Sequence, residues 1–184
     1  MLHFAYGSNM HRAVMRKHAP SAVPLGVARL EGYRFIVTAD GYASVVPQLR
    51  ACVHGVLWRL TARDRVTLDL WENIAGGMYR AAMLPIVHSG MRRRVLVYVA
   101  RARPRGQPRP GYMEIVVQAA RELELPGYYI ASLQHWLCKQ ARGAGHRGLG
   151  EFNLENLREG TSPHRHQRPG ARHRLPRLDG SHGA

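Results

Sequence analysis

The sequence predicts a domain built from both strands and helices, on three observations. Runs rich in β-branched and aromatic residues, separated by turn signals, fill residues 23–60 and 78–101. Apolar residues follow helical spacing in segments 11–20, 61–74, 112–125 and 129–141. A hydrophobic content of 45% in 184 residues is typical of a globular chain, which at this length can bury a core without disulfides.

The first apolar run, HFAY at residues 3–6, suits a buried strand, and the chain leaves it through Tyr6-Gly7-Ser8-Asn9. Side-chain oxygens of Ser8 or Asn9 are expected to cap the helix that Pro20 ends. This turn has two interpretations. It is either a simple turn with a helix cap or a cradle of backbone N–H groups for a charged ligand.

The later elements follow from turn and cap residues. Residues 23–48 are predicted to form strands and a hairpin turning at Ala39-Asp40-Gly41, and residues 52–60 a further, half-buried strand. Thr61 is predicted to cap the helix over 61–74, which the glycines at 76 and 77 end. Residues 78–101 read as a hairpin turning at 88–90, residues 103–111 as a loop, and two helices follow.

A change of composition predicts the domain organisation. Residues 1–142 form one domain, whereas residues 143–184 are rich in His, Arg, Pro and Gly and hold few apolar residues. Such a segment cannot bury enough surface to offset its chain entropy, so we predict a largely disordered basic tail. Its histidines lack the fixed spacing of a metal site and are interpreted as solvated.

Cys52 and Cys138, far apart in sequence, favour two reduced thiols in a cytoplasmic protein. The start of the chain lacks the pattern of a signal peptide, and no apolar run approaches the ~18 residues of a membrane span. We therefore expect a cytoplasmic protein without a membrane partner.

The net charge of +15 arises from 27 basic and 12 acidic residues, and such a charge attracts anions. Nearly all of the basic residues are arginines, a usage that a GC-rich genome also produces. No helix-turn-helix, RRM or KH signature is visible, so nucleic-acid binding is kept as the alternative rather than the main interpretation.

Candidate chemistry is limited because several motifs are missing. The sequence lacks a nucleophile elbow, a phosphate-binding loop, a dinucleotide fingerprint and a zinc motif, so we expect no cofactor and no metal. Glu72 lies beside Trp71 and just before a glycine pair, where desolvation can raise a carboxyl pKa towards neutrality. It is either a general acid–base or a surface residue at a helix end. One carboxylate with backbone donors suits a reaction in which the substrate supplies its own nucleophile.

Four segments, FAYGSNM, VARLEGYRF, VHGVLWRL and LDLWEN followed by GGMY, together resemble the γ-glutamylcyclotransferase-like, or AIG2-like, family. The resemblance extends from residue 2 to about 135. It implies an α+β fold with a small, barrel-like, mainly antiparallel sheet and flanking helices. It also implies an enzyme, of the kind found in glutathione metabolism, that releases 5-oxoproline from a γ-glutamyl compound by cyclisation without hydrolysis.

The resemblance assigns the site residues. Glu72 falls on the catalytic glutamate, and the loop Tyr6, Gly7, Ser8 and Asn9 falls on the substrate-binding cradle. Further substrate-binding positions fall on Tyr79, Tyr112 and Tyr129, and Tyr128 competes for the last role. Tyr79 has the alternative role of a strand aromatic in the core.

The expected partner is a small γ-glutamyl compound. Relatives act on γ-glutamyl amino acids, γ-glutamyl-ε-lysine or γ-glutamyl-protected intermediates, and the sequence does not separate these. The alternative function is that of a non-catalytic basic domain of the same fold, which binds an anionic ligand or nucleic acid.

Overall fold

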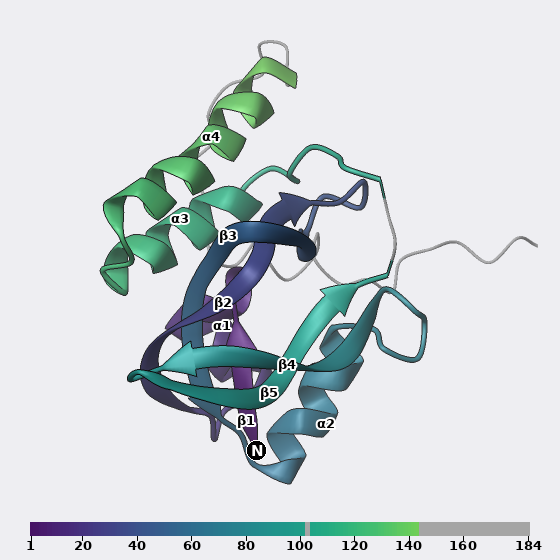
Figure 1. Ribbon diagram of the computed structural model, residues 1–184. Coiled ribbons are helices and arrows are strands. Elements are labelled where there is room, and N and C mark those ends of the chain that lie inside the picture. The colour runs from purple at the N-terminus through teal and green to yellow at the C-terminus, as the bar shows by residue number, and fades with distance from the viewer. Residues whose placement is uncertain (102–103, 144–184) are drawn as a thin grey trace, which may run out of the picture.

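The computed structural model describes residues 1–101 and 104–143, whose strands close into a five-stranded barrel with four flanking α-helices (Figure 1). In chain order the elements are β1 (Leu2–Ala5), the 3₁₀ turn η1 (Ser8–Met10), α1 (Arg12–His18), β2 (Val23–Val37), β3 (Ala43–Arg59), α2 (Ala62–Trp71), β4 (Tyr79–His88), β5 (Met91–Ala100), α3 (Tyr112–Glu122) and α4 (Gly127–Gly143).

The strand order around the barrel is β1-β3-β2-β4-β5, and β1 closes it. The short strand β1 pairs antiparallel with β3 and parallel with β5, where His3 lies opposite Leu96. The pairs β2–β3, β2–β4 and β4–β5 are antiparallel. The predicted α+β fold with a mixed, mainly antiparallel barrel-like sheet is therefore confirmed.

The longest strand differs from the prediction. Residues 52–60 were expected to form a strand separate from the hairpin at 23–48, but β3 runs unbroken from Ala43 to Arg59. Its first part pairs with 33–37 of β2 and its last part with 23–31, with register shifts at Pro24/Gly26 and Glu31/Tyr33. Shifts of this kind bend a strand pair, so one curved hairpin replaces two shorter units.

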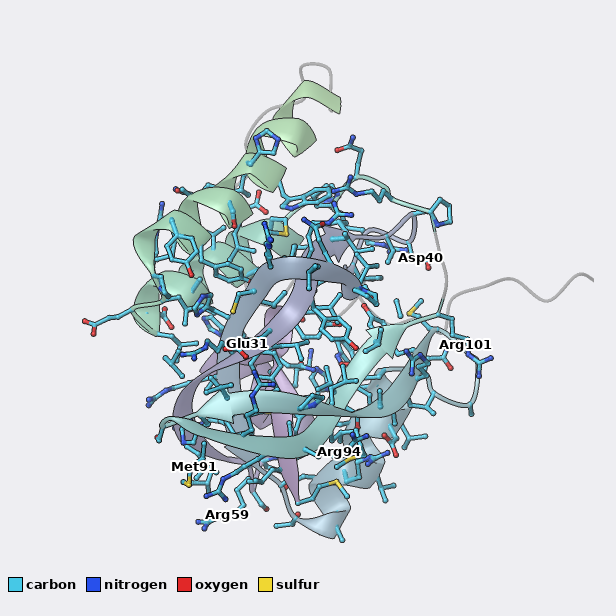
Figure 2. All side chains as sticks on the ribbon, viewed as in Figure 1. Glu31, Asp40, Arg59, Met91, Arg94 and Arg101 are labelled. Atoms are coloured by element: carbon cyan, nitrogen blue, oxygen red, sulfur yellow. The ribbon has the colours of Figure 1, made fainter. Side chains whose placement is uncertain are left out.

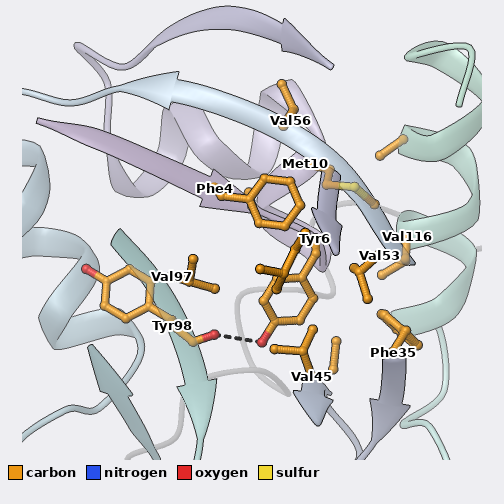
Figure 3. Close-up of a cluster of buried hydrophobic side chains, with 14 of the residues drawn as sticks. Phe4, Tyr6, Met10, Phe35, Val45, Val53, Val56, Val97, Tyr98 and Val116 are labelled. Carbon is orange, nitrogen blue, oxygen red and sulfur yellow. Dashed lines mark hydrogen bonds between the residues drawn. The ribbon is translucent and has the colours of Figure 1, made fainter. Parts of the chain in front are cut away.

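The core fills the barrel interior (Figure 3). Phe4 and Tyr6 meet Val45, Val53 and Val97, which come from β3 and β5. All five residues from Val95 to Val99 of β5 are buried, so both faces of the sheet are covered there, because successive side chains of a strand point to opposite faces. Helices α3 and α4 lie side by side (Figure 1), and α3 places six buried residues, among them Met113 and Val116, in this core.

Two further predictions concern segments at the surface. The turn of the β4–β5 hairpin is confirmed, because Ser89 and Gly90 both adopt the left-handed conformation that a tight hairpin favours. Apart from Gly143, which ends α4, the predicted tail at 143–184 lies outside the described residues. Basic side chains such as Arg59, Arg94 and Arg101 lie exposed on the outside of the barrel (Figure 2).

A glycine inside the barrel generates a stability prediction. A Cβ at Gly55 would overlap the carbonyl oxygen of Ala5 and the ring of Phe4, where β1 pairs with β3. Gly55→Ala is expected to lower the free energy of unfolding by about 3 kcal/mol, the upper end for overpacking, because backbone must move. Urea denaturation of the variant and the unmodified protein measures this difference in the free energy of unfolding. Gly127→Ala is the control, since a Cβ there meets no heavy atom within 4 Å, and equal midpoints for the two variants would contradict the prediction.

Candidate active site

A cavity of about 320 Å³ is lined by β1 and the loop that follows this strand, by α1 and by the end of α2. Its size is at the lower end of the ~300–1,000 Å³ range of small-molecule sites. Most of its lining is apolar or aromatic. The lining residues are His3, Phe4, Ala5, Tyr6, Gly7, Ser8, Asn9, Ala13, Val14, Lys17, His18, Tyr42, Ala43, Trp71, Glu72, Met78, Tyr79, Tyr98 and Tyr112.

The loop after β1 forms one wall of the cavity, in a way that differs from the predicted helix cap. Ser8 and Asn9 belong to the 3₁₀ turn, and α1 begins only at Arg12. The residue before α1 is His11, which makes no side-chain cap, so the predicted cap by Ser8 or Asn9 is wrong. The Asn9 side chain is directed to Glu72 instead.

Gly7 is required by packing and not by its backbone angles. Its φ of −110° is accessible to any residue. A Cβ at this position would lie 2.7 Å from the hydroxyl oxygen of Tyr112 and 3.3 Å from the Cβ of Ala43. Only a residue without a side chain therefore allows the loop to approach α3 and β3 this closely.

Glu72 follows directly after α2 and donates its backbone N–H to the carbonyl of Leu68. The Nδ2 of Asn9 donates to the Oε1 of Glu72 over 2.8 Å. Burial raises the pKa of Glu72 to about 8, the Asn9 hydrogen bond lowers it in part, and the charge of Asp69 raises it further. The carboxyl can therefore both hold and release a proton near neutral pH.

The start of α2 fixes where Glu72 falls. Thr61 and Asp64 form a capping box, which confirms the predicted cap by Thr61. Asp64 is almost fully buried and also accepts from the backbone N–H of Ser21, which follows α1. This second contact joins α2 to the segment after α1.

Two predicted tyrosines of the cavity lining hold the backbone of Ala43. Tyr79 donates its hydroxyl to the carbonyl of Ala43 over 2.7 Å, and the Tyr112 hydroxyl accepts from the N–H of Ala43 over 3.2 Å. Burial raises the pKa of Tyr112 to about 12, so this hydroxyl keeps its proton at neutral pH. Both tyrosines are buried and line the cavity. Tyr79 is therefore both an aromatic residue of the core and a residue of the cavity wall.

The structure brings together every predicted site residue except Tyr129. That residue is buried on α4, where its ring lies 5.0 Å from the ring of His54, and it does not line the cavity. Its competitor Tyr128 is exposed, and its hydroxyl lies 2.7 Å from Nε2 of the same histidine. Neither tyrosine reaches the cavity.

Sequence reasoning missed the lining residues Tyr98 and Lys17. It also missed the Arg65–Asp69 pair, which is not among the lining residues and binds the Tyr98 hydroxyl. Tyr98 of β5 donates its hydroxyl to Asp69 over 2.6 Å, and Arg65 donates to the same carboxylate oxygen over 2.7 Å. The signal for Arg65 and Asp69 was their spacing of four residues on one helix. Lys17 was also detectable, as one of only two lysines in the chain.

Two structural features are absent from residues 1–101 and 104–143. No cluster of three or more His, Cys, Asp or Glu side chains in these ranges is placed to hold a metal ion. No helix within the described part of the chain has the length and apolar character needed to cross a membrane.

Comparisons with known proteins agree on one family and fold. The sequence profile of the AIG2-like family matches residues 52–133. The γ-glutamylcyclotransferases of Mus musculus and Homo sapiens are each 26% identical over 144 residues, which span 72% of this chain and 77% of the relative. A solved structure of a γ-glutamyl cyclotransferase superposes with a TM-score of 0.72 at 23% identity, covering 84% of this chain and 94% of that one.

The raised pKa of Glu72 is testable directly. In protein labelled with ¹³C at the glutamate carboxyls, one resonance is expected to titrate near pH 8, because the buried carboxyl retains its proton. Glu72→Gln assigns it by removing it. Asn9→Ala is expected to move this midpoint upward, since it deletes the hydrogen bond that favours the carboxylate. If all glutamates titrated in the ordinary acidic range, the buried position of this carboxyl would be wrong.

Proposed function

The chain belongs to the AIG2-like, or γ-glutamylcyclotransferase, family, and from this premise we propose that it releases 5-oxoproline from a γ-glutamyl amide. The observation that carries the proposal is the Glu72 carboxyl, with a pKa of about 8, held by Asn9 in a cavity of small-molecule size. A carboxyl with its pKa near the working pH is suited to both accepting and donating a proton.

The reaction is an intramolecular acyl transfer. The α-amine nitrogen of the glutamyl group attacks its own δ-carbonyl carbon, and the new N–C bond closes a five-membered ring. The bond from the δ-carbon to the leaving nitrogen breaks, and the proton lost by the amine ends on that nitrogen. Because both reactants belong to one molecule, holding a folded conformer supplies much of the rate, with effective molarities of about 10⁵ M or more.

Glu72 is proposed to move that proton. In the free protein the carboxyl is largely protonated at neutral pH, since its pKa is about 8. A bound α-ammonium group beside it favours the carboxylate, because an opposite charge lowers a carboxyl pKa. The carboxylate accepts a proton from the α-ammonium group, which frees the amine to attack, and donates that proton to the leaving nitrogen. The second proton that the ring nitrogen loses on closure returns to the carboxylate.

The loop Tyr6-Gly7-Ser8-Asn9 is proposed to anchor the glutamyl α-carboxylate through its backbone N–H groups. The absence of a side chain at Gly7 lets the loop pack closely against Tyr112 and Ala43, which holds these N–H groups in place. Tyr79 and Tyr112 support the loop from the opposite wall by holding Ala43. Preorganised donors of this kind favour a folded substrate over an extended one.

Glu72→Gln tests the proposed proton transfer. The variant keeps the shape of the side chain but cannot shuttle a proton, so 5-oxoproline release should fall by ~10²–10⁴-fold, the usual contribution of a general acid–base group. The assay uses γ-glutamyl amino acids, glutathione and γ-glutamylamines. Glu122→Gln, an exposed change on α3, is the matched control. Unchanged release by Glu72→Gln would refute the role, and no product from any compound with the unmodified protein would favour a non-catalytic domain.

Gly7→Ala tests the loop. The added methyl group displaces the Tyr112 hydroxyl or the loop, and KM is expected to rise about tenfold or more, since a shift of ~1 Å in a site can cost 10²-fold. Adding Tyr112→Phe removes the nearest clashing atom and should restore part of the loss. Thermal unfolding of each variant separates a local change from loss of the fold. An unchanged KM in folded Gly7→Ala would show that substrate does not approach this backbone.

A further inference from the structure

The cavity extends beyond the residues that the proposed reaction uses. In addition to Glu72 and the loop at Gly7, its lining includes Ala13, Val14, Lys17 and His18 of α1 and Trp71 of α2. We refer to these five residues as the distal end. The rings of His18 and Trp71 stack with centroids 3.7 Å apart and an interplanar angle of 20°, which joins the two helices there.

Helical spacing orders the distal end along the cavity. Residues 13, 14, 17 and 18 occupy one face of α1, and the second pair lies one turn, about 5.4 Å, beyond the first. Asn9 contacts Glu72 before this helix begins, whereas His18 contacts Trp71 at its end. Because Trp71 precedes Glu72 in the chain, the distal end adjoins the position of a group that leaves from beside Glu72.

The charges of the cavity are unevenly placed. Of the Lys, Arg, Asp and Glu side chains that the structure describes, only Glu72 and Lys17 are among the lining residues. Burial lowers the pKa of His3 and of His18 to about 4, so both are neutral at pH 7. Lys17 is exposed and forms no ion pair with any residue in the described ranges. Its ammonium group is therefore available to an anionic group of a ligand.

We infer that the distal end is the subsite for the released amine, and that it takes an amino acid with a large apolar side chain whose carboxylate pairs with Lys17. This inference rests on the proposed function, because the glutamyl group must occupy the end near Gly7. Ala13, Val14 and the stacked His18–Trp71 pair supply the apolar surface. A released amine that carries a second ammonium group is disfavoured by the like charge of Lys17.

Binding to the Glu72→Gln protein tests the carboxylate contact without turnover. Isothermal titration calorimetry compares γ-glutamylphenylalanine with γ-glutamylphenethylamine, which differ only in the carboxylate of the released part. The former is expected to bind about five- to tenfold more tightly, as for one charge-assisted contact at a partly exposed site. Lys17→Met should abolish this preference and Lys17→Glu should reverse it. Arg16→Met, which removes an exposed cation of α1 outside the cavity, should leave it unchanged.

A second pair of ligands tests the apolar surface. γ-Glutamylphenylalanine is expected to bind about tenfold more tightly than γ-glutamylalanine, since burying part of an aromatic ring gains on the order of 1.4 kcal/mol. Equal affinities for this pair would overturn the apolar assignment.

Failure of the subsite and failure of the proposed function give different results. If Lys17→Met weakened both phenyl compounds equally, Lys17 would bind the glutamyl group instead, and the subsite would be wrong. An unchanged ratio in Lys17→Met would overturn it as well. If the unmodified protein formed no 5-oxoproline although the binding preferences held, the proposed reaction would be wrong while the subsite stood.

Discussion

The hydrogen bond from Asn9 to Glu72 joins segments 63 residues apart, and the arrangement of the cavity depends on it. Asn9 belongs to the turn that leaves the barrel at β1, and Glu72 is the first residue after α2. The other end of α2 is fixed by Thr61 and Asp64, and Asp64 is tied to Ser21. A ten-residue helix held at both ends leaves the acid little freedom, so its position follows from the packing of α2 on the barrel.

A second constraint is the short distance between Gly7 and the lining residues Tyr112 and Ala43. Tyr112 at the start of α3 places its hydroxyl where any side chain at position 7 would be, and the same hydroxyl accepts from Ala43. Tyr79 accounts for the carbonyl of Ala43. The starts of β3, β4 and α3 thus meet beside the loop at Gly7. The closed barrel supplies the rigid frame that keeps them there.

Local pattern was sufficient for most elements, since periodicity, the Thr61 cap and the hairpin at 88–90 depend on neighbouring residues only. It failed where distant residues compete. The Asn9 side chain donates to Glu72 instead of capping α1. The two predicted strands form one strand, β3, because β2 pairs with both parts of it. Glu72 stood out through its apolar neighbours. Lys17, although one of only two lysines, was not assigned to the site because its place in the lining depends on how α1 packs. Tyr129 lies outside the lining because α4 packs it against His54.

The proton on Glu72 also affects the fold as a whole. An ordinary glutamate pKa is 4.5, whereas in the folded protein this carboxyl reaches about 8. The folded chain therefore binds this proton more tightly than the unfolded chain does, and folding takes up a proton between these two values. The stability that this group contributes is fully present below pH 4.5 and is lost as the pH rises towards 8. The same burial that raises the pKa of Glu72, as the proposed proton transfer requires, thus makes the protein less stable under alkaline conditions.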